Sequence, residues 1–279
     1  MVKQPVSVLL LSEPDYDEFA LKYFLLYLNK IQDYYEFAFP EPRDESIFNF
    51  YSQDTYDTEE LFSSFEQVRS KVGFDFGTAP VFFIVIINSR IDSAKANASD
   101  LFWDTRGNTA FITTRKWEGV FAPPSLFEYL MHCVIACLVQ MNKKIHLDSH
   151  VEVRGCYLDY TYYKENDRVD IALGYVCDRC KTALSEVGPD YYSQLAHVLS
   201  RTWIGNIRDF GTVAFNLKNF FNFDIDKDSG FREPEKTRRE KIIDWFYSVT
   251  NQAATSLVLI IVGAVAGGIA GYVLKGILG

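Results

Sequence analysis

The chain has 279 residues, of which 48% are hydrophobic and 16% are aromatic. This composition can fill the core of one large domain or two small ones, and it excludes an intrinsically disordered protein. The formal net charge of −9 argues against a nucleic-acid partner held through its phosphates, because such binding needs a basic face.

The first part of the chain predicts alternating strands and helices. The apolar run at 6–12 is typical of a buried strand, and residues 18–35 repeat apolar side chains at helical spacing. A second helix is expected at 58–72, followed by a central strand at 79–90 that contains the run PVFFIVII. We interpret 91–100 as a loop.

Two further elements complete this part of the chain. Residues 108–115 predict a strand, and the two prolines of FAPPSLFEYLMHCVIACLVQMN at 121–142 mark the start of a long apolar helix. Strands that alternate with helices in this way favour an α/β fold, with α+β as the alternative, in which helices cover a sheet.

The cysteines predict a bound metal. Five is an odd number, and the sequence MVKQPVSVLLLSEPD lacks the basic start and long apolar run of a signal peptide. We therefore expect a reducing cytoplasm, where close cysteines bind metal more often than they form disulfides. Cys177 and Cys180 form a C-x-x-C pair downstream of Cys156. Such a pair presents two thiolates to one zinc ion, so 150–184 predicts a zinc knuckle, with three ordinary buried thiols as the alternative.

This segment resembles the archaemetzincins, which belong to the metzincin zinc metallopeptidases. Their pattern joins a catalytic H-E-x-x-H-x-x-G-x-x-H motif to four cysteines that hold a second, structural zinc. Cys156, Cys177 and Cys180 match three of those cysteines with one inserted residue. Val151 stands at the first cysteine, and Leu158 stands at the methionine of the Met-turn. The resemblance implies a metzincin-like sheet-and-helix domain with a structural zinc.

The catalytic half of the family pattern is absent from this sequence. His150 matches the third zinc histidine, whereas Gln140 and Lys144 stand where the first two would be. Met141 replaces the glutamate that acts as general base, and Leu147 replaces the glycine. A helix without a facing pair of histidines cannot hold zinc in the open three-ligand geometry that activates water. We therefore predict a structural zinc and no catalytic residues.

A tetrahedral zinc needs a fourth ligand, for which the sequence offers several candidates. His150 lies one residue from the missing cysteine, and its imidazole would complete a Cys3His site. The other candidates are His146, Asp148, Cys133 and Cys137. The last two lie four residues apart on an apolar helix, where core packing is the simpler interpretation.

The C-terminal part of the sequence predicts a membrane anchor. Residues 253–274 carry no charge, and at a rise of about 1.5 Å per residue they would cross roughly 30 Å of hydrocarbon. The flank before them is basic and ends in aromatic residues at the expected interface level. Its key residues are Lys236, Arg238, Arg239, Lys241, Trp245 and Tyr247. By the positive-inside rule, such a tail anchor keeps residues 1 to about 245 in the cytoplasm.

Glycines within the expected anchor favour packing between membrane helices. Gly263, Gly267 and Gly271 recur at every fourth position and form two overlapping G-x-x-x-G motifs. Small residues on one face let helix backbones approach closely in lipid. We expect the anchor to form a homo-oligomer, and the sequence does not distinguish a dimer from a pore.

These predictions give three regions: a metzincin-like domain at 1–188, a helical juxtamembrane region at 189–250 and the anchor at 251–279. We expect a binding function, in which a cytoplasmic pseudo-metallopeptidase domain recruits or senses an unidentified cytosolic protein. A prokaryotic antiphage or cell-death effector, acting through oligomerisation of the glycine-rich helix, is one form of it. The alternative is an active membrane-anchored zinc metallopeptidase that would use His146 and His150 together with Glu128 or Asp148.

Overall fold

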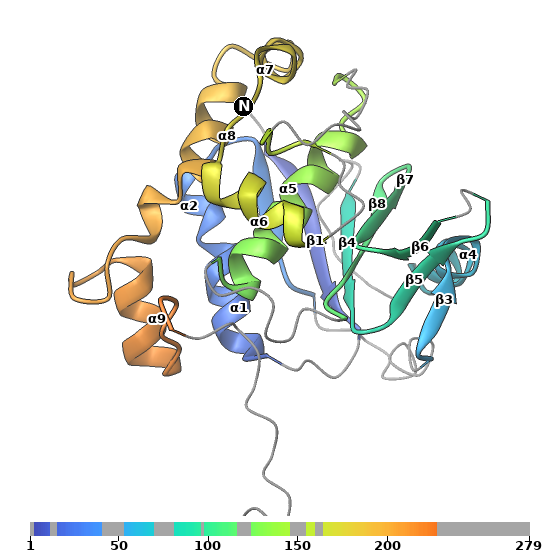
Figure 1. Cartoon of the computed structure of the whole chain (residues 1–279), viewed down its shortest axis with the longest axis horizontal. Helices are drawn as coiled ribbons and strands as arrows, with labels where there is room; N and C mark the ends of the chain where they lie inside the picture. The colour runs from blue at the N-terminus through green and yellow to red at the C-terminus, as the bar shows by residue number, and fades with distance from the viewer. Residues whose placement is uncertain are drawn as a thin grey trace, which may run out of the picture. The chain divides into compact units, whose positions relative to one another are not determined.

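Figure 1 shows a computed structural model of the chain, a mixed α/β arrangement of two sheets and several helices. All of the residues that it describes belong to one compact unit, Met1–Arg232. The described residues are 3–11, 16–40, 53–69, 81–95, 98–115, 124–145, 155–159 and 164–227. The α/β class predicted from the sequence is confirmed.

The larger sheet has five strands in the order β2-β1-β4-β8-β7. Its first four strands are parallel, and the edge strand β7 runs antiparallel to β8. Val6 lies at the centre of the register, opposite Phe37 on one side and Phe82 on the other. The strands are β1 (Gln4–Leu10), β2 (Tyr35–Ala38), β4 (Phe82–Ile87), β7 (Trp103–Arg106) and β8 (Thr109–Thr113).

A smaller sheet joins β3 (Thr55–Asp57), β5 (Arg90–Ser93) and β6 (Ala98–Leu101). Helix α4 (Thr58–Val68) follows β3 directly and begins at Asp57, whose carboxylate accepts a hydrogen bond from the backbone N–H of Glu59. This cap satisfies one of the free N–H groups at the helix start.

Both faces of the larger sheet are buried, because successive residues of a strand point to opposite faces. Val8 and Ile84 belong to one apolar core, whereas Leu9 and Val85 belong to another. The second core also contains the buried residues Leu61, Phe62 and Phe65 of α4. Strands buried on both faces explain the continuous apolar runs in the sequence.

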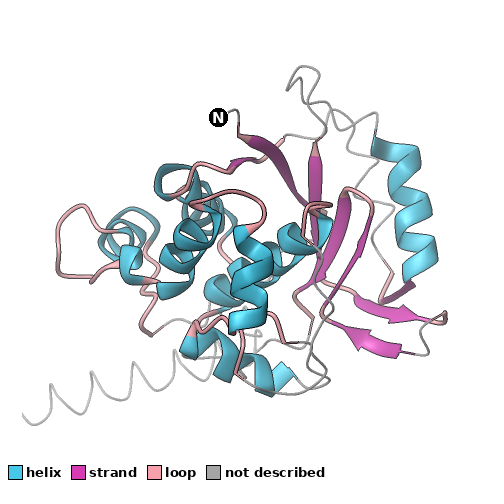
Figure 2. Cartoon of the chain, turned by 90° about the horizontal axis from the view of Figure 1, so that it is seen from above, coloured by secondary structure: helices cyan, strands magenta, loops and turns pink. Residues whose placement is uncertain are grey.

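Helices pack on the other face of the sheet, as Figure 2 shows from above. The core there contains residues of helices from both ends of the described chain, including the segment after 188. These helices are α1 (Glu18–Leu26), α2 (Leu28–Ile31), α5 (Leu126–Met141), α6 (Lys164–Leu173), α7 (Asp178–Ser185), α8 (Tyr191–Ser200), the short 3-10 helix η2 (Thr202–Ile204) and α9 (Val213–Phe221).

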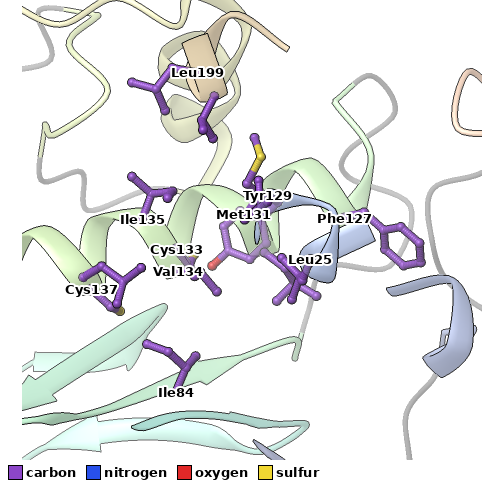
Figure 3. Packing of buried hydrophobic residues seen from close by; sticks show 14 of the residues in the cluster. Leu25, Ile84, Phe127, Tyr129, Met131, Cys133, Val134, Ile135, Cys137 and Leu199 are labelled. Atoms are coloured by element: carbon purple, nitrogen blue, oxygen red, sulfur yellow. The ribbon is translucent and has the colours of Figure 1, made fainter. Parts of the chain in front are cut away.

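Helix α5 is the centre of this layer, and all of its residues except Gln140 are buried. Figure 3 shows it between Ile84 of the sheet and Leu199 of α8. The helix begins at Leu126, after the two prolines, because Ser125 caps it. The Ser125 hydroxyl accepts from the backbone N–H of Glu128, and the Glu128 carboxylate accepts from the backbone N–H of Ser125.

Two predicted segments differ from the structure. The helix expected at 18–35 ends at Ile31, and residues from Tyr35 pair with β1 instead. Gln32 makes this change of direction, because its side-chain oxygen accepts hydrogen bonds from the backbone N–H groups of Tyr34 and Tyr35. The expected loop at 91–100 contains most of a β5–β6 pair. Tyr35–Ala38 pairs with the distant strand β1, and β5 pairs with the distant strand β3 as well as with its neighbour β6, so in both places strand pairing outweighs the local pattern.

Candidate metal centre

Three cysteine side chains from two separate segments come together. The Sγ atoms of Cys156, Cys177 and Cys180 all lie within 4.8 Å of one another. Three thiolates bound to one tetrahedral zinc at about 2.3 Å would be roughly 3.8 Å apart, so the group needs only small shifts to hold a metal ion. This donor set is consistent with a structural zinc, as predicted from the sequence.

Cys156 is held by a short turn. Its backbone N–H donates to the carboxylate of Asp159 at 3.0 Å, and the Asp159 N–H donates back to the Cys156 carbonyl at 2.8 Å. The preceding Gly155 has a φ of +73°, which side chains other than glycine rarely adopt. A parallel bridge between Cys156 and Tyr175 then brings this turn beside the chain that leads into α7.

The other two thiols lie at the start of α7. Cys177 is the N-cap residue, and Cys180 occupies the third position of the helix. The backbone N–H of Cys177 donates to the sulfur of Cys156 at 3.4 Å. This bond, together with the free N–H groups and the dipole at the start of α7, stabilises negative charge on the sulfur of Cys156.

The hydrogen bond between Cys156 and Cys180 shifts the pKa values of these two thiols in opposite directions. The pKa of Cys156 is lowered to about 6, first because Cys180 donates a hydrogen bond to its sulfur. The pKa of Cys180 is raised by that same hydrogen bond and by burial. One thiolate therefore forms readily, and it shares the proton of its neighbour. A cation is the natural replacement for that proton, because metal binding deprotonates thiol ligands.

The remaining ligand candidates do not join this group in the described part of the chain. Cys133 and Cys137 lie in the apolar core of α5, and they are separate from the three clustered thiols. His146, Asp148 and His150 lie outside the described residues, so the fourth ligand stays a prediction.

The structure describes three of the positions that the sequence resemblance aligns with catalytic residues of the archaemetzincins. Gln140 lies on the last turn of α5, where its side-chain oxygen accepts a hydrogen bond from the Thr105 hydroxyl at 3.0 Å. Met141 is buried. Lys144 lies beyond Asn142, the residue that ends the helix, so Gln140 and Lys144 do not share a helical face. Leu147 lies outside the described residues.

Sequence reasoning missed a buried polar group on α5. Glu128 pairs with Arg201 at 2.8 Å, in addition to capping its own helix. One turn later, His132 is 3% exposed, and its Nδ1 has no hydrogen-bond partner among the described residues. Its ring lies 4.2 Å from that of Tyr157, and burial lowers its pKa to about 3. The S-x-x-E spacing from Ser125 was the available signal for the cap.

Because Glu128 caps α5 and pairs with Arg201, it is held by structural contacts on both carboxylate oxygens. A general base must be within hydrogen-bond reach of a water or substrate proton. The described contacts of Glu128 therefore give it a structural role as a helix cap and an ion-pair partner. They do not support Glu128 as the general base of a peptidase.

The membrane predictions lie outside the described residues. Gly263, Gly267, Gly271 and the whole segment 253–274 belong to that part. Among the helices that the structure describes, none is both long and apolar enough to cross a membrane.

Comparisons with known proteins give structural similarity only. No family model matches the sequence, and no curated protein matches it. The structure is similar to an archaemetzincin from Methanopyrus kandleri, with 14% identity and a TM-score of 0.40 over 72% of this chain and 95% of that one. It is also similar to an archaemetzincin from Archaeoglobus fulgidus complexed with malonate, with 12% identity and a TM-score of 0.40 over 64% and 99% of the two chains. A zinc-dependent peptidase from Methanocorpusculum labreanum gives 12% identity and a TM-score of 0.42 over 64% and 98%.

Proposed function

We propose that this chain is a membrane-anchored binding protein whose metzincin-like domain carries a structural zinc and does not cleave peptides. The thiol cluster is the observation that carries the proposal. Cys156, Cys177 and Cys180 come from two segments, and a shared ion would fasten those segments together. Thiolate ligands favour zinc among the common cellular metals.

A structural role fits the surroundings of the cluster better than a catalytic one. Cys156 and Cys180 are almost fully buried, whereas a catalytic zinc keeps one position open for water. The nearby carboxylate of Asp159 accepts a hydrogen bond from the Cys156 backbone. We propose His150 as the fourth ligand, which would close the site as Cys3His.

We propose that the domain binds its partner at a membrane surface. The uncharged run 253–274 and its basic, aromatic flank support an anchor with the α/β domain in the cytoplasm. Gly263, Gly267 and Gly271 support self-association of that anchor. The domain would then recruit or sense a cytosolic protein, and an effector of antiphage or cell-death type would couple that event to the bilayer.

The zinc is tested by metal analysis of the purified full-length chain. We expect about one zinc per chain in the wild type and a loss of most of it in Cys177→Ser. Cys137→Ala, which changes a thiol of the α5 core, is the matched control and should keep the metal. Wild-type protein that contains no zinc after expression with added zinc would refute the site. His150→Ala tests the fourth ligand separately. Full retention of zinc in this variant would exclude His150 as a ligand and leave the three-cysteine site intact.

Peptidase activity is tested on the same preparation. We expect no chelator-sensitive cleavage of a fluorogenic peptide library. Among the described residues, no pair of histidines faces a general base. Chelator-sensitive cleavage by the wild type, lost in His146→Ala, would support the peptidase alternative instead.

The anchor is tested by fractionation of cells that express the full chain or a chain that ends at residue 252. We expect only the full chain to stay in alkali-washed membranes. Gly267→Leu should weaken cross-linked oligomers, whereas Val265→Leu, which adds bulk on the opposite helical face, should not. A truncated chain that remains in the membrane fraction would refute the anchor.

A further inference from the structure

A cavity of about 340 Å³ opens at the end of the larger sheet, and none of its lining residues is a cysteine of the thiol cluster. It lies where β1, β2 and β4 begin, next to the segment after α5 and the first residue of α8. The lining residues on which the inference rests are Lys3, Tyr34, Tyr35, Phe82, Lys144 and Tyr191. Its volume falls within the range of small-molecule sites, which runs from about 300 to 1,000 Å³.

Among the described residues of the lining, the charged side chains are all positive, although the chain as a whole has a formal charge of −9. They are Lys3 and Lys144, and no described lining residue carries a carboxylate. Lys3 is already occupied: its ammonium donates to the carbonyls of Asn29 and Gln32 and lies 3.6 Å from the Asp33 carboxylate. Lys144 forms no ion pair with any residue that the structure describes. The cavity therefore attracts anions and disfavours cations.

Two buried tyrosine hydroxyls provide hydrogen-bond donors beside the positive charge of Lys144. The hydroxyls of Tyr35 and Tyr191 lie 2.8 Å apart, and the two residues are 6% and 3% exposed. Burial raises the pKa of both phenols, so both stay protonated. One hydroxyl hydrogen is used in the bond between them. The side-chain amide of Asn142 donates to both hydroxyls, which leaves the second hydroxyl hydrogen for a molecule in the cavity.

Aromatic side chains supply the apolar part of the lining. The ring of Tyr34 meets that of Tyr191 edge to face, with centroids 4.7 Å apart. Phe82 lines the cavity from the start of β4. Binding sites for small molecules commonly combine apolar walls with a few polar groups that fix the orientation of the ligand.

We propose that this cavity binds a small organic anion with a planar body. Lys144 would pair with the carboxylate or phosphate of the ligand, the tyrosine hydroxyl pair would donate to it, and Tyr34 and Phe82 would contact the ring. The inference is independent of the zinc site, because no lining residue belongs to the thiol cluster.

Calorimetric titration of the full-length chain with three probes tests this site: phenyl phosphate, benzoate and inorganic phosphate. We expect a Kd of about 1 mM or lower for phenyl phosphate or benzoate, and weaker binding of inorganic phosphate, which has no planar body. The probe with the higher affinity shows whether the acidic group is a phosphate or a carboxylate.

Two neighbouring lysines provide the decisive variants. Lys144→Gln should weaken the better probe at least about tenfold, whereas Lys143→Gln should change its Kd less than about twofold. Lys143 is also exposed but does not line the cavity, so both variants remove one charge from the same loop. Equal weakening by both variants would overturn the proposal, because it would reflect net charge alone. The absence of binding by all three probes at about 10 mM would also overturn it.

Discussion

Two pairs of cysteines in this chain have similar spacing and opposite surroundings. Cys133 and Cys137 lie one turn apart inside α5, and burial raises the pKa of Cys137 well above its usual value. Cys177 and Cys180 lie at the start of α7, close to Cys156 from another segment. The first pair consists of small core side chains, and only the second pair has the position and the third partner that a metal needs.

The difference shows that burial alone does not decide which thiols bind metal. Cys180 is as deeply buried as Cys133, yet it lies at a helix N-terminus and shares a proton with Cys156. The three thiols meet because the start of α7 lies beside the turn that carries Cys156. Metal binding therefore depends on which thiols the fold brings together.

The largest expected effect is that of zinc removal on stability. If free zinc exceeds its Kd about a thousandfold, the bound ion adds about 4 kcal/mol to the free energy of unfolding. Chemical unfolding of the wild type with and without a chelator should show this loss, and Cys177→Ser should be insensitive to chelator. Cys137→Ala should cost about 1 kcal/mol and remain fully sensitive to chelator. Equal chelator responses in the two variants would remove the distinction between the pairs.

The second prediction concerns pH and the dry core of α5. His132 has a pKa of about 3 in the folded chain, against an ordinary value of 6.5, so below pH 6.5 the unfolded chain binds the extra proton. Stability should therefore fall as the pH decreases from 6.5 toward 3, by at most about 1.4 kcal/mol per pH unit from this residue.

Between pH 7 and 4, the unfolding free energy of His132→Phe should depend less on pH than that of the wild type. A chelator should not change this difference between the two proteins. If His132→Phe and the wild type have parallel profiles, then His132 is protonated without penalty, and α5 is not the closed core that its burial indicates.

Much of the fold was predictable where the local pattern was strong. The all-apolar strand Phe82–Ile87 and the long helix of residues 126–141 were both expected. Strand Tyr35–Ala38 was not, because a short strand gains its stability from a partner that lies far away in the sequence. The pairing of Tyr35–Ala38 with β1 depends on register, which composition does not reveal.

The same distinction applies to the sites. The C-x-x-C spacing identifies Cys177 and Cys180 as candidate metal ligands, and the resemblance to archaemetzincins identifies Cys156 as a third. The anion cavity has no local signal, because Lys3, Tyr34, Lys144 and Tyr191 come from four distant parts of the chain. A motif can be recognised when one turn supplies its ligands, whereas a cavity requires the tertiary structure.

The smallest expected effect separates backbone strain from metal binding. Gly155 and Gly107 have similar positive φ values, +73° and +60°, so an alanine at either position should cost about 1–2 kcal/mol in the free energy of unfolding. An added Cβ at Gly155 would lie 2.8 Å from the end of the exposed Leu173 side chain, and one at Gly107 would meet nothing within 4 Å. Because Gly155 directly precedes Cys156, only Gly155→Ala should also weaken zinc binding in a competition with a chromogenic chelator. If both variants lower the zinc affinity equally, the turn before Cys156 does not position the metal. The position of Cys177 and Cys180 at the start of α7 would then be the remaining difference between the two cysteine pairs.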